Sequence, residues 1–156
     1  KLALCSAIAA TSSKTIIESR GHKIEGIESF PIIVSDDIES ISKSNEIVKV
    51  LESLKLTQDT DRLESRKSRS GQSRLRGRSK KVGKSVLFVT KEDKEMSKAI
   101  GALPGVEVKS VKDLSVLDLA PGSHPIRLTV YSKSAIEEIA KIKSTHLEVM
   151  VKSQWM

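Results

Sequence analysis

The chain has 156 residues, the size of one domain, and 27 Lys and Arg against 20 Asp and Glu give it a net charge of +7. Its single cysteine, Cys5, excludes an internal disulfide and fits a reducing compartment. No run approaches the roughly 20 apolar residues of a membrane span, and the sequence shows no signal-peptide pattern. Because Lys1 cannot be a translation start, we expect the chain to begin partway through a longer protein.

The first third of the chain predicts two helices with a strand between them. Residues 1–19 are rich in small and apolar side chains at helical spacing, and Gly21 follows at the expected helix stop. Residues 30–34 form a short apolar run that is typical of a buried strand. Residues 35–37 supply helix-capping side chains, and residues 43–55 again have apolar residues at helical spacing.

The second half of the chain alternates strands with helices. Apolar or alternating runs predict strands at 86–89, 106–108 and 127–131. Helices are expected at 92–100, where a glycine follows, and at 133–142, where serines can cap the first turn. This alternation predicts an α/β fold with a mostly parallel sheet and helices on both faces.

The same pattern predicts the domain organisation. We expect one α/β domain over residues 1–143, interrupted by a basic segment at residues 62–84. Residues 144–156 alternate only weakly in hydrophobicity, so we treat them as a C-terminal tail of unassigned structure.

Residues 62–84 differ from the rest of the chain in charge. The segment has ten basic residues and one acid, Glu64, so it carries +9 and the remainder of the chain carries −2. It is rich in serine and glycine and has almost no apolar residues, so it cannot bury a core and its charges repel one another. We expect an irregular, glycine-hinged arm that becomes ordered on a polyanion; a solvated linker or a localisation signal is the alternative.

Nucleic acid is the polyanion that fits this composition best. Arginine makes bidentate contacts with phosphate, and glycine allows two backbones to approach closely. The chain lacks the aromatic pairs with which RNA-reading sheets stack on bases. Binding is therefore expected to rest on phosphate contacts and on shape.

The motifs for catalysis and for metal binding are incomplete. Gly83-Lys84-Ser85 resembles the end of a phosphate-binding loop, but Arg78 stands where that loop requires a glycine, and the tripeptide precedes a strand. The acids at residues 36–39 are explained by helix capping, and the three histidines lack zinc-ligand spacing. We expect no metal, no cofactor and no enzymatic activity.

Six short motifs occur in one order along the chain. They are Ser6-Ala7-Ile8-Ala9-Ala10-Thr11, Arg20-Gly21-His22, Pro31-Ile32-Ile33-Val34-Ser35-Asp36, Ser70-Gly71-Gln72-Ser73-Arg74-Leu75-Arg76-Gly77-Arg78, Leu103-Pro104-Gly105-Val106 and Leu117-Asp118-Leu119-Ala120-Pro121-Gly122. With these motifs the sequence resembles the family of ribosomal protein four of the large subunit, in its archaeal and eukaryotic form, over about residues 1–142. The sequence departs from the family pattern at Gln72 and Ser73, which replace a lysine and a glycine, and at Pro125 and Ile126.

The resemblance implies a Rossmann-like α/β domain seated on large-subunit ribosomal RNA. Its partners would be that RNA and neighbouring ribosomal proteins in the cytoplasm, with no membrane contact and no small-molecule substrate. The family's N-terminal strand, and the loop that reaches the peptide exit tunnel, would lie upstream of Lys1.

The candidate RNA-binding residues combine the basic segment with two residues that follow the last motif. They are Arg62, Arg66, Lys67, Arg69, Gly71, Arg74, Arg76, Gly77, Arg78, Lys80, Lys81, Lys84, His124 and Arg127. The alternative function is a free RNA- or DNA-binding regulator that uses the same basic arm. Co-sedimentation with large subunits through a high-salt wash would separate the two functions.

Overall fold

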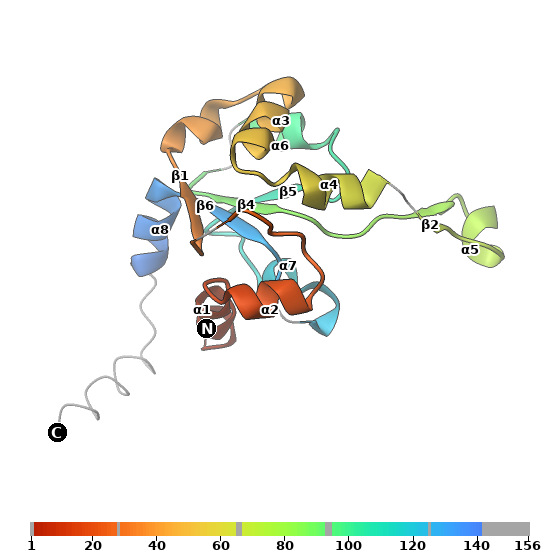
Figure 1. Ribbon diagram of the computed structural model, residues 1–156, viewed down its shortest axis with the longest axis horizontal. Helices are drawn as coiled ribbons and strands as arrows, with labels where there is room; N and C mark the ends of the chain where they lie inside the picture. The colour runs from red at the N-terminus through yellow and green to blue at the C-terminus, as the bar shows by residue number, and fades with distance from the viewer. Residues whose placement is uncertain (1, 28, 65–66, 93–94, 125, 142–156) are drawn as a thin grey trace.

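The computed structural model describes residues 2–27, 29–64, 67–92, 95–124 and 126–141. The expected tail at 144–156 lies outside these residues. Within them the chain forms helices around one sheet, with a hairpin that extends away from it (Figure 1).

The sheet has four parallel strands in the order β1-β6-β4-β5. The strands are β1 (Ile32–Val34), β4 (Leu87–Thr90), β5 (Glu107–Ser110) and β6 (Thr129–Ser132). Every residue of the two central strands, β4 and β6, is buried. This result confirms the predicted parallel sheet, and it explains why the central strands are dominated by apolar residues.

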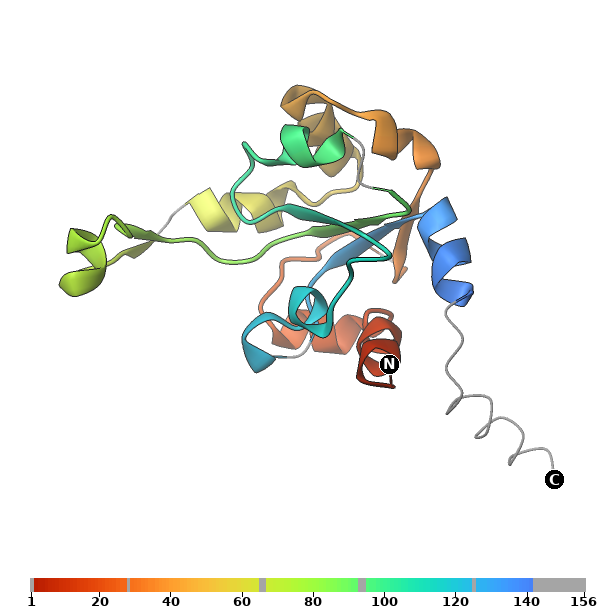
Figure 2. The same cartoon turned by 180° about the vertical axis from the view of Figure 1, so that it is seen from behind.

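Helices cover both faces of the sheet (Figures 1 and 2). The helices on one side are α3 (Ser44–Ser53), α4 (Thr57–Glu64) and α6 (Met96–Ile100), and those on the other are α1 (Leu2–Ala10), α2 (Lys14–Ser19) and α7 (Val116–Leu119). Helix α8 (Lys133–Ala140) packs on β4 and β6, and two short 3₁₀ helices, η1 (Asp36–Ser40) and η2 (Pro121–Ser123), complete the connections. The α/β class is therefore confirmed. The core is mainly aliphatic, and no helix of the described residues is long and apolar enough to cross a membrane.

The predicted single helix over residues 1–19 is wrong, because α1 and α2 are separated by a turn at residues 11–13. The Thr11 hydroxyl donates to the carbonyl oxygen of Ile8 at 2.6 Å and lies 3.2 Å from the hydroxyl of Tyr131. Threonine side chains compete with the backbone for such hydrogen bonds. The buried contact to β6 therefore accompanies a bend that an apolar pattern does not reveal.

The acids that follow β1 bind other parts of the chain, and one of them caps helix α8. The backbone N–H of Ser134, in the first turn of α8, donates to the Asp36 carboxylate at 2.8 Å. The buried Glu39 carboxylate accepts a hydrogen bond from the Ser132 hydroxyl at 2.7 Å and one from the backbone N–H of Lys91 at 2.9 Å. Capping thus accounts for Asp36, as expected, although the capped helix is α8 and not the one that follows β1. Glu39 instead links the residues at the ends of β4 and β6.

Candidate nucleic-acid interface

The basic segment forms an antiparallel hairpin rather than an irregular loop. Strand β2 (Lys67–Ser68) pairs with β3 (Lys80–Lys81), and the amide of Arg69 donates to the carbonyl oxygen of Ser79 at 2.8 Å. The short helix α5 (Gln72–Leu75) forms the tip, at the point of the molecule farthest along the hairpin from the sheet (Figure 1). The expectation of an irregular arm is therefore wrong over residues 67–81. We call residues 67–84 the basic hairpin.

Two glycines shape the tip of the hairpin. Gly71 precedes α5 with φ 65°, and Gly77 follows it with φ 75°. Both values lie in the left-handed region, which glycine adopts without steric cost. The backbone therefore turns sharply before and after α5, at residues that have no side chain to clash.

The cations of the basic hairpin point into solvent. Six of them are exposed and Arg69 is half-buried; the six are Arg74, Arg76, Arg78, Lys80, Lys81 and Lys84. Residues 67–84 contain no carboxylate, and of the exposed cations only Lys84 forms an ion pair with another described residue, Glu107. Arg66 and the side chain of Lys67 lie outside the described part of the chain. The hairpin is thus a cationic surface that the rest of the described chain barely neutralises.

Helix α4 anchors the root of the hairpin through Arg62. The Arg62 side chain lies 3.1 Å from the carboxylate of Asp59 on the same helix, and it also donates to the backbone carbonyl of Lys84 at 3.5 Å. About a third of the Arg62 side chain is exposed. Arg62 therefore links the start of the predicted segment to its end.

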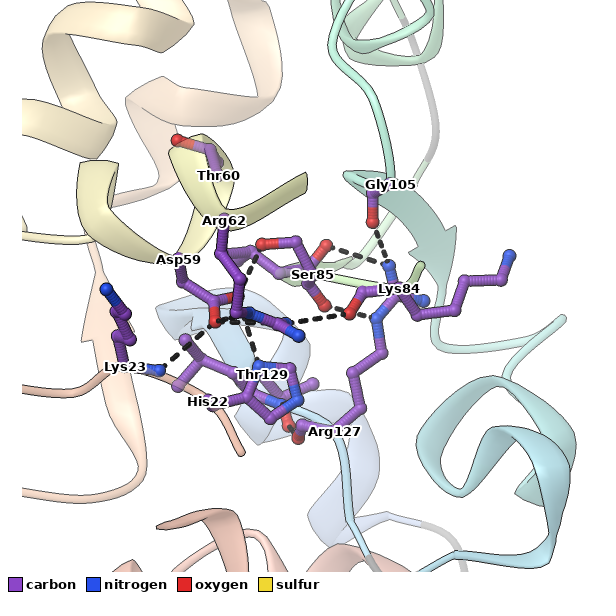
Figure 3. A network of polar contacts seen from close by, with 12 residues as sticks. His22, Lys23, Asp59, Thr60, Arg62, Lys84, Ser85, Gly105, Arg127 and Thr129 are labelled. Atoms are coloured by element: carbon purple, nitrogen blue, oxygen red, sulfur yellow. Dashed lines mark hydrogen bonds and ion pairs between the residues drawn. The ribbon is translucent and has the colours of Figure 1, made fainter. Parts of the chain in front are cut away.

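Asp59 is the centre of a buried polar network (Figure 3). Its carboxylate accepts hydrogen bonds from the Ser85 hydroxyl at 2.5 Å and from the backbone N–H of Lys23 at 3.2 Å, and Nδ1 of His22 lies 3.0 Å away. Burial alone would raise the pKa of Asp59, but the bonds from His22 and Ser85 and the charge of Arg62 outweigh burial and hold that pKa below its usual value. The carboxylate is therefore ionised at neutral pH and ties α4 to the strand that leaves the hairpin.

Arg127 does not belong to the surface. Its side chain has no exposed area, and its guanidinium donates to the carbonyl oxygens of Ser85, of Val86 at 3.0 Å and of Gly105 at 2.7 Å (Figure 3). It also donates to the Glu107 carboxylate at 2.6 Å. A guanidinium held in this way cannot reach a phosphate while the domain is folded. The expectation that Arg127 binds RNA is therefore corrected: Arg127 joins the residues before β4 and β5.

His124 is exposed beside the end of α2. Its backbone carbonyl accepts a hydrogen bond from Arg20 at 2.9 Å, and the carbonyl of Pro121 accepts another from Arg20 at 2.8 Å. Unlike Arg127, the His124 ring lies where a ligand can reach it. The described residues hold no group of three or more His, Cys, Asp and Glu side chains placed to bind a metal ion.

Comparison with known proteins identifies the family. The model of the ribosomal protein L4/L1 family matches residues 1–142. The chain belongs to this family. The large ribosomal subunit protein uL4 of Sulfurisphaera tokodaii is 46% identical over 143 residues, covering 90% of this chain and 53% of the relative. The uL4 proteins of Haloquadratum walsbyi and Methanococcus aeolicus are 45% and 44% identical, covering 90% and 89% of this chain and 56% of each relative. The chain thus spans about half the length of these relatives.

Membership of the ribosomal protein L4/L1 family confirms the resemblance drawn from the six motifs. The sequence pattern nevertheless did not indicate Asp59 and Ser85, which are bonded to each other at the root of the hairpin, or Arg20, which is bonded to the carbonyls of Pro121 and His124. A weak sequence pattern could have indicated that Asp59 is buried. The acid lies at helical spacing between Leu56 and Leu63, and the structure buries both leucines. For Ser85 and Arg20 the partners are distant in sequence, and no local pattern indicates them.

Proposed function

We propose that this member of the ribosomal protein L4/L1 family is a structural constituent of the large ribosomal subunit and that its basic hairpin binds large-subunit ribosomal RNA. The observation that carries the proposal is the group of six exposed cations on an arm that contains no carboxylate. Such an arm gains little by packing on its own domain, whereas on RNA each cation meets phosphate and displaces condensed counterions.

The proposal describes a binding protein rather than an enzyme. Its partners are large-subunit RNA and neighbouring ribosomal proteins in the cytoplasm, in keeping with the relatives' name, large ribosomal subunit protein. The RNA-binding set comprises Arg62, Arg66, Lys67, Arg69, Gly71, Arg74, Arg76, Gly77, Arg78, Lys80, Lys81, Lys84 and His124. The family's role at the peptide exit tunnel belongs to the same proposal.

The salt dependence of RNA affinity tests the hairpin directly. If about six cations contact phosphate, the slope of log affinity against log salt should be near −4 to −5, between the single-strand and duplex coefficients. Replacing Arg74, Arg76 and Arg78 together by Ala should make the slope shallower by about two to three units. The measurement is filter binding of the 156-residue chain to a large-subunit RNA transcript over a range of salt concentrations.

A matched variant tests whether RNA binding depends on where the cations lie or only on the total charge of the chain. Lys49, Lys98 and Lys112 are exposed lysines outside the hairpin, so replacing all three by Ala removes the same charge. This control should keep the wild-type slope within about one unit. Circular dichroism checks that both variants fold. Equal slopes for the two triple variants would show that the hairpin is not the RNA contact.

A further inference from the structure

A groove of about 430 Å³ lies between helices α3 and α4, which cover the same side of the sheet (Figure 1). Each helix contributes three lining residues at i, i+3 and i+4 spacing, and this spacing places the three on one face of their helix. The loop between α6 and β5 completes the wall. The lining residues are Val48, Leu51, Glu52, Thr57, Thr60, Asp61, Leu103 and Pro104. The groove thus shares no residue with the proposed RNA-binding set.

Aliphatic side chains make up one part of this groove. Leu51 is buried in the core, and Leu103 packs against the core while it remains partly exposed. Val48 and Pro104 are also half-buried. The apolar part of a ligand that covered these three half-buried side chains would remove them from water, which is favourable.

Two carboxylates border the same groove. Glu52 and Asp61 are exposed, and neither forms an ion pair or a side-chain hydrogen bond with another residue of the described chain. No lysine, arginine or histidine is among the described residues that line the groove. Lys49 of α3 is exposed but does not line it. The groove therefore combines apolar surface with negative charge that its own wall does not neutralise.

This combination selects the ligand. Both carboxylates would repel an RNA phosphate. A hard metal ion needs more oxygen ligands than these two, and the described residues contain no group of three or more acidic, His or Cys side chains placed to hold one. A lysine or arginine side chain matches both properties of the groove, because its aliphatic stem covers apolar surface while its charged head stays at a polar edge.

We propose that this groove binds a basic segment of another protein. The stem of a lysine or arginine in that segment lies on Val48, Leu103 and Pro104, and its charged head meets Glu52 or Asp61. The choice of a protein partner rests on the proposed function, in which the chain is assembled with other ribosomal proteins. The chain would then use two separate surfaces of opposite charge, the basic hairpin for RNA and the groove for protein.

Two peptides test the chemistry of the groove. One is a ten-residue peptide of alternating lysine and serine, and the other has diaminobutyrate in place of lysine, which keeps the charge on a stem two methylenes shorter. The whole chain has a net charge of +7, so a cationic peptide is repelled overall and binds only where carboxylates gather. NMR titration of the 156-residue chain should shift the amides of Leu51 and Leu103. The shorter stem should weaken binding by about threefold, because less apolar surface is covered.

Variants of the groove test the residues themselves. Glu52→Gln combined with Asp61→Asn should weaken binding of the lysine peptide by about tenfold, because two exposed charge pairs are lost. Val48→Ala shortens the apolar wall and keeps a helix-favouring residue in α3, so it should weaken binding by about threefold. Circular dichroism checks that both fold. If the double variant does not fold, Val48→Ala and the shorter peptide decide.

Glu18→Gln combined with Glu137→Gln is the matched control. Both residues are exposed carboxylates outside the groove, on α2 and α8, and neither forms an ion pair with another described residue. This variant changes the net charge by the same amount as the groove variant. It should bind the lysine peptide within about twofold of the unmodified chain.

RNA affinity separates this inference from the proposed function. The groove variant should bind a large-subunit RNA transcript within about twofold of the unmodified chain. If the groove variant and its control bind the peptide equally while the hairpin triple variant loses RNA, the groove inference is overturned and the hairpin function stands. A tenfold loss of RNA affinity in the groove variant would make RNA the ligand. A dimer in sedimentation that only the groove variant abolishes would make a second copy the occupant, and either result would overturn the inference.

Discussion

Arg127 and Arg76 are the same kind of residue in two opposite situations. Arg127 is fully buried and bonded to Glu107 and to three backbone carbonyls, whereas Arg76 is exposed on a hairpin that contains no carboxylate. The first arginine has its acceptors inside the chain and stabilises the fold. The second forms no side-chain hydrogen bond or ion pair with the residues that the structure describes, so it remains available to an external anion. A count of basic residues therefore does not reveal which of them bind a partner.

Removing the buried charge of Arg127 should change the stability of the fold most. Arg127→Met removes the buried one of the two cations that contact the Glu107 carboxylate, and it takes one donor from each of the carbonyls of Ser85, Val86 and Gly105, so the free energy of unfolding should fall by about 3–5 kcal/mol. Arg76→Met, the matched change on the hairpin, should alter it by less than about 0.5 kcal/mol. Urea denaturation followed by circular dichroism measures both. Similar losses in the two variants would contradict the assigned roles.

Two glycines show the same difference between the root and the tip of the hairpin in the backbone. Gly105 and Gly77 have nearly the same φ, 77° and 75°. A Cβ on Gly105 would lie 2.6 Å from the carbonyl oxygen of Gly83 and against the side chain of Leu63, whereas one on Gly77 would meet nothing within 4 Å.

Gly105→Ala should therefore lower the free energy of unfolding by about 3 kcal/mol, from left-handed strain and overpacking together. Gly77→Ala should lower it by about 1 kcal/mol, from strain alone. Paired thermal and urea unfolding measures the difference. If both substitutions cost the same, the root of the hairpin is not packed as closely as the structure has it.

A smaller effect is expected in the pH dependence of stability, which should arise from Asp59 at the root of the hairpin and not from the exposed cations. The folded pKa of Asp59 is lowered, so the unfolded state binds more protons than the folded state in acid, and stability must fall as pH drops. This contribution is fully present above the unfolded pKa of about 4 and is lost as pH falls through the lower folded value.

Asp59→Asn should accordingly flatten the dependence of unfolding free energy on pH below about 5. Asp61→Asn, which alters an exposed carboxyl on the same helix, is the control and should keep the wild-type profile. Urea midpoints measured from pH 3 to pH 7 provide the test. An unchanged profile in Asp59→Asn would mean that the His22 and Ser85 contacts do not hold this carboxyl ionised.

The sheet could be predicted from the sequence because its central strands are short buried runs and because β5 alternates between half-buried and buried residues. Phe88 and Val130 lie on central strands where both faces are covered, so the pattern is nearly continuous. Helix α4 was not predicted, because the buried residue of its first turn is the ionised Asp59 rather than an apolar one. The charge of the segment predicted a basic arm but not the pairing of β2 with β3. Residues 67–68 and 80–81 have no apolar face that would mark them as strands.

The candidate site shows the same limit. Exposure of Arg74, Arg76 and Arg78 followed from a segment too polar to be buried. The burial of Arg127 depends on Glu107, 20 residues away, and on Ser85, 42 residues away. Contacts at that separation are created by the parallel sheet, which brings the starts of β4, β5 and β6 together, and sequence spacing does not encode them.

The contacts at Lys84 and Ser85 restrict the direction of the hairpin. The hairpin returns to the sheet through these two residues, and there the chain is hydrogen-bonded to Asp59, Arg62 and Arg127 (Figure 3). The hairpin is thus fixed at its root, and its direction is set by contacts with the core rather than by contacts within the hairpin. If the hairpin binds RNA as proposed, an arm that is fixed at its root loses less rotational freedom on binding than a freely jointed tail of equal charge. Weakening the contacts at the root should then weaken RNA binding even though every exposed cation remains in place.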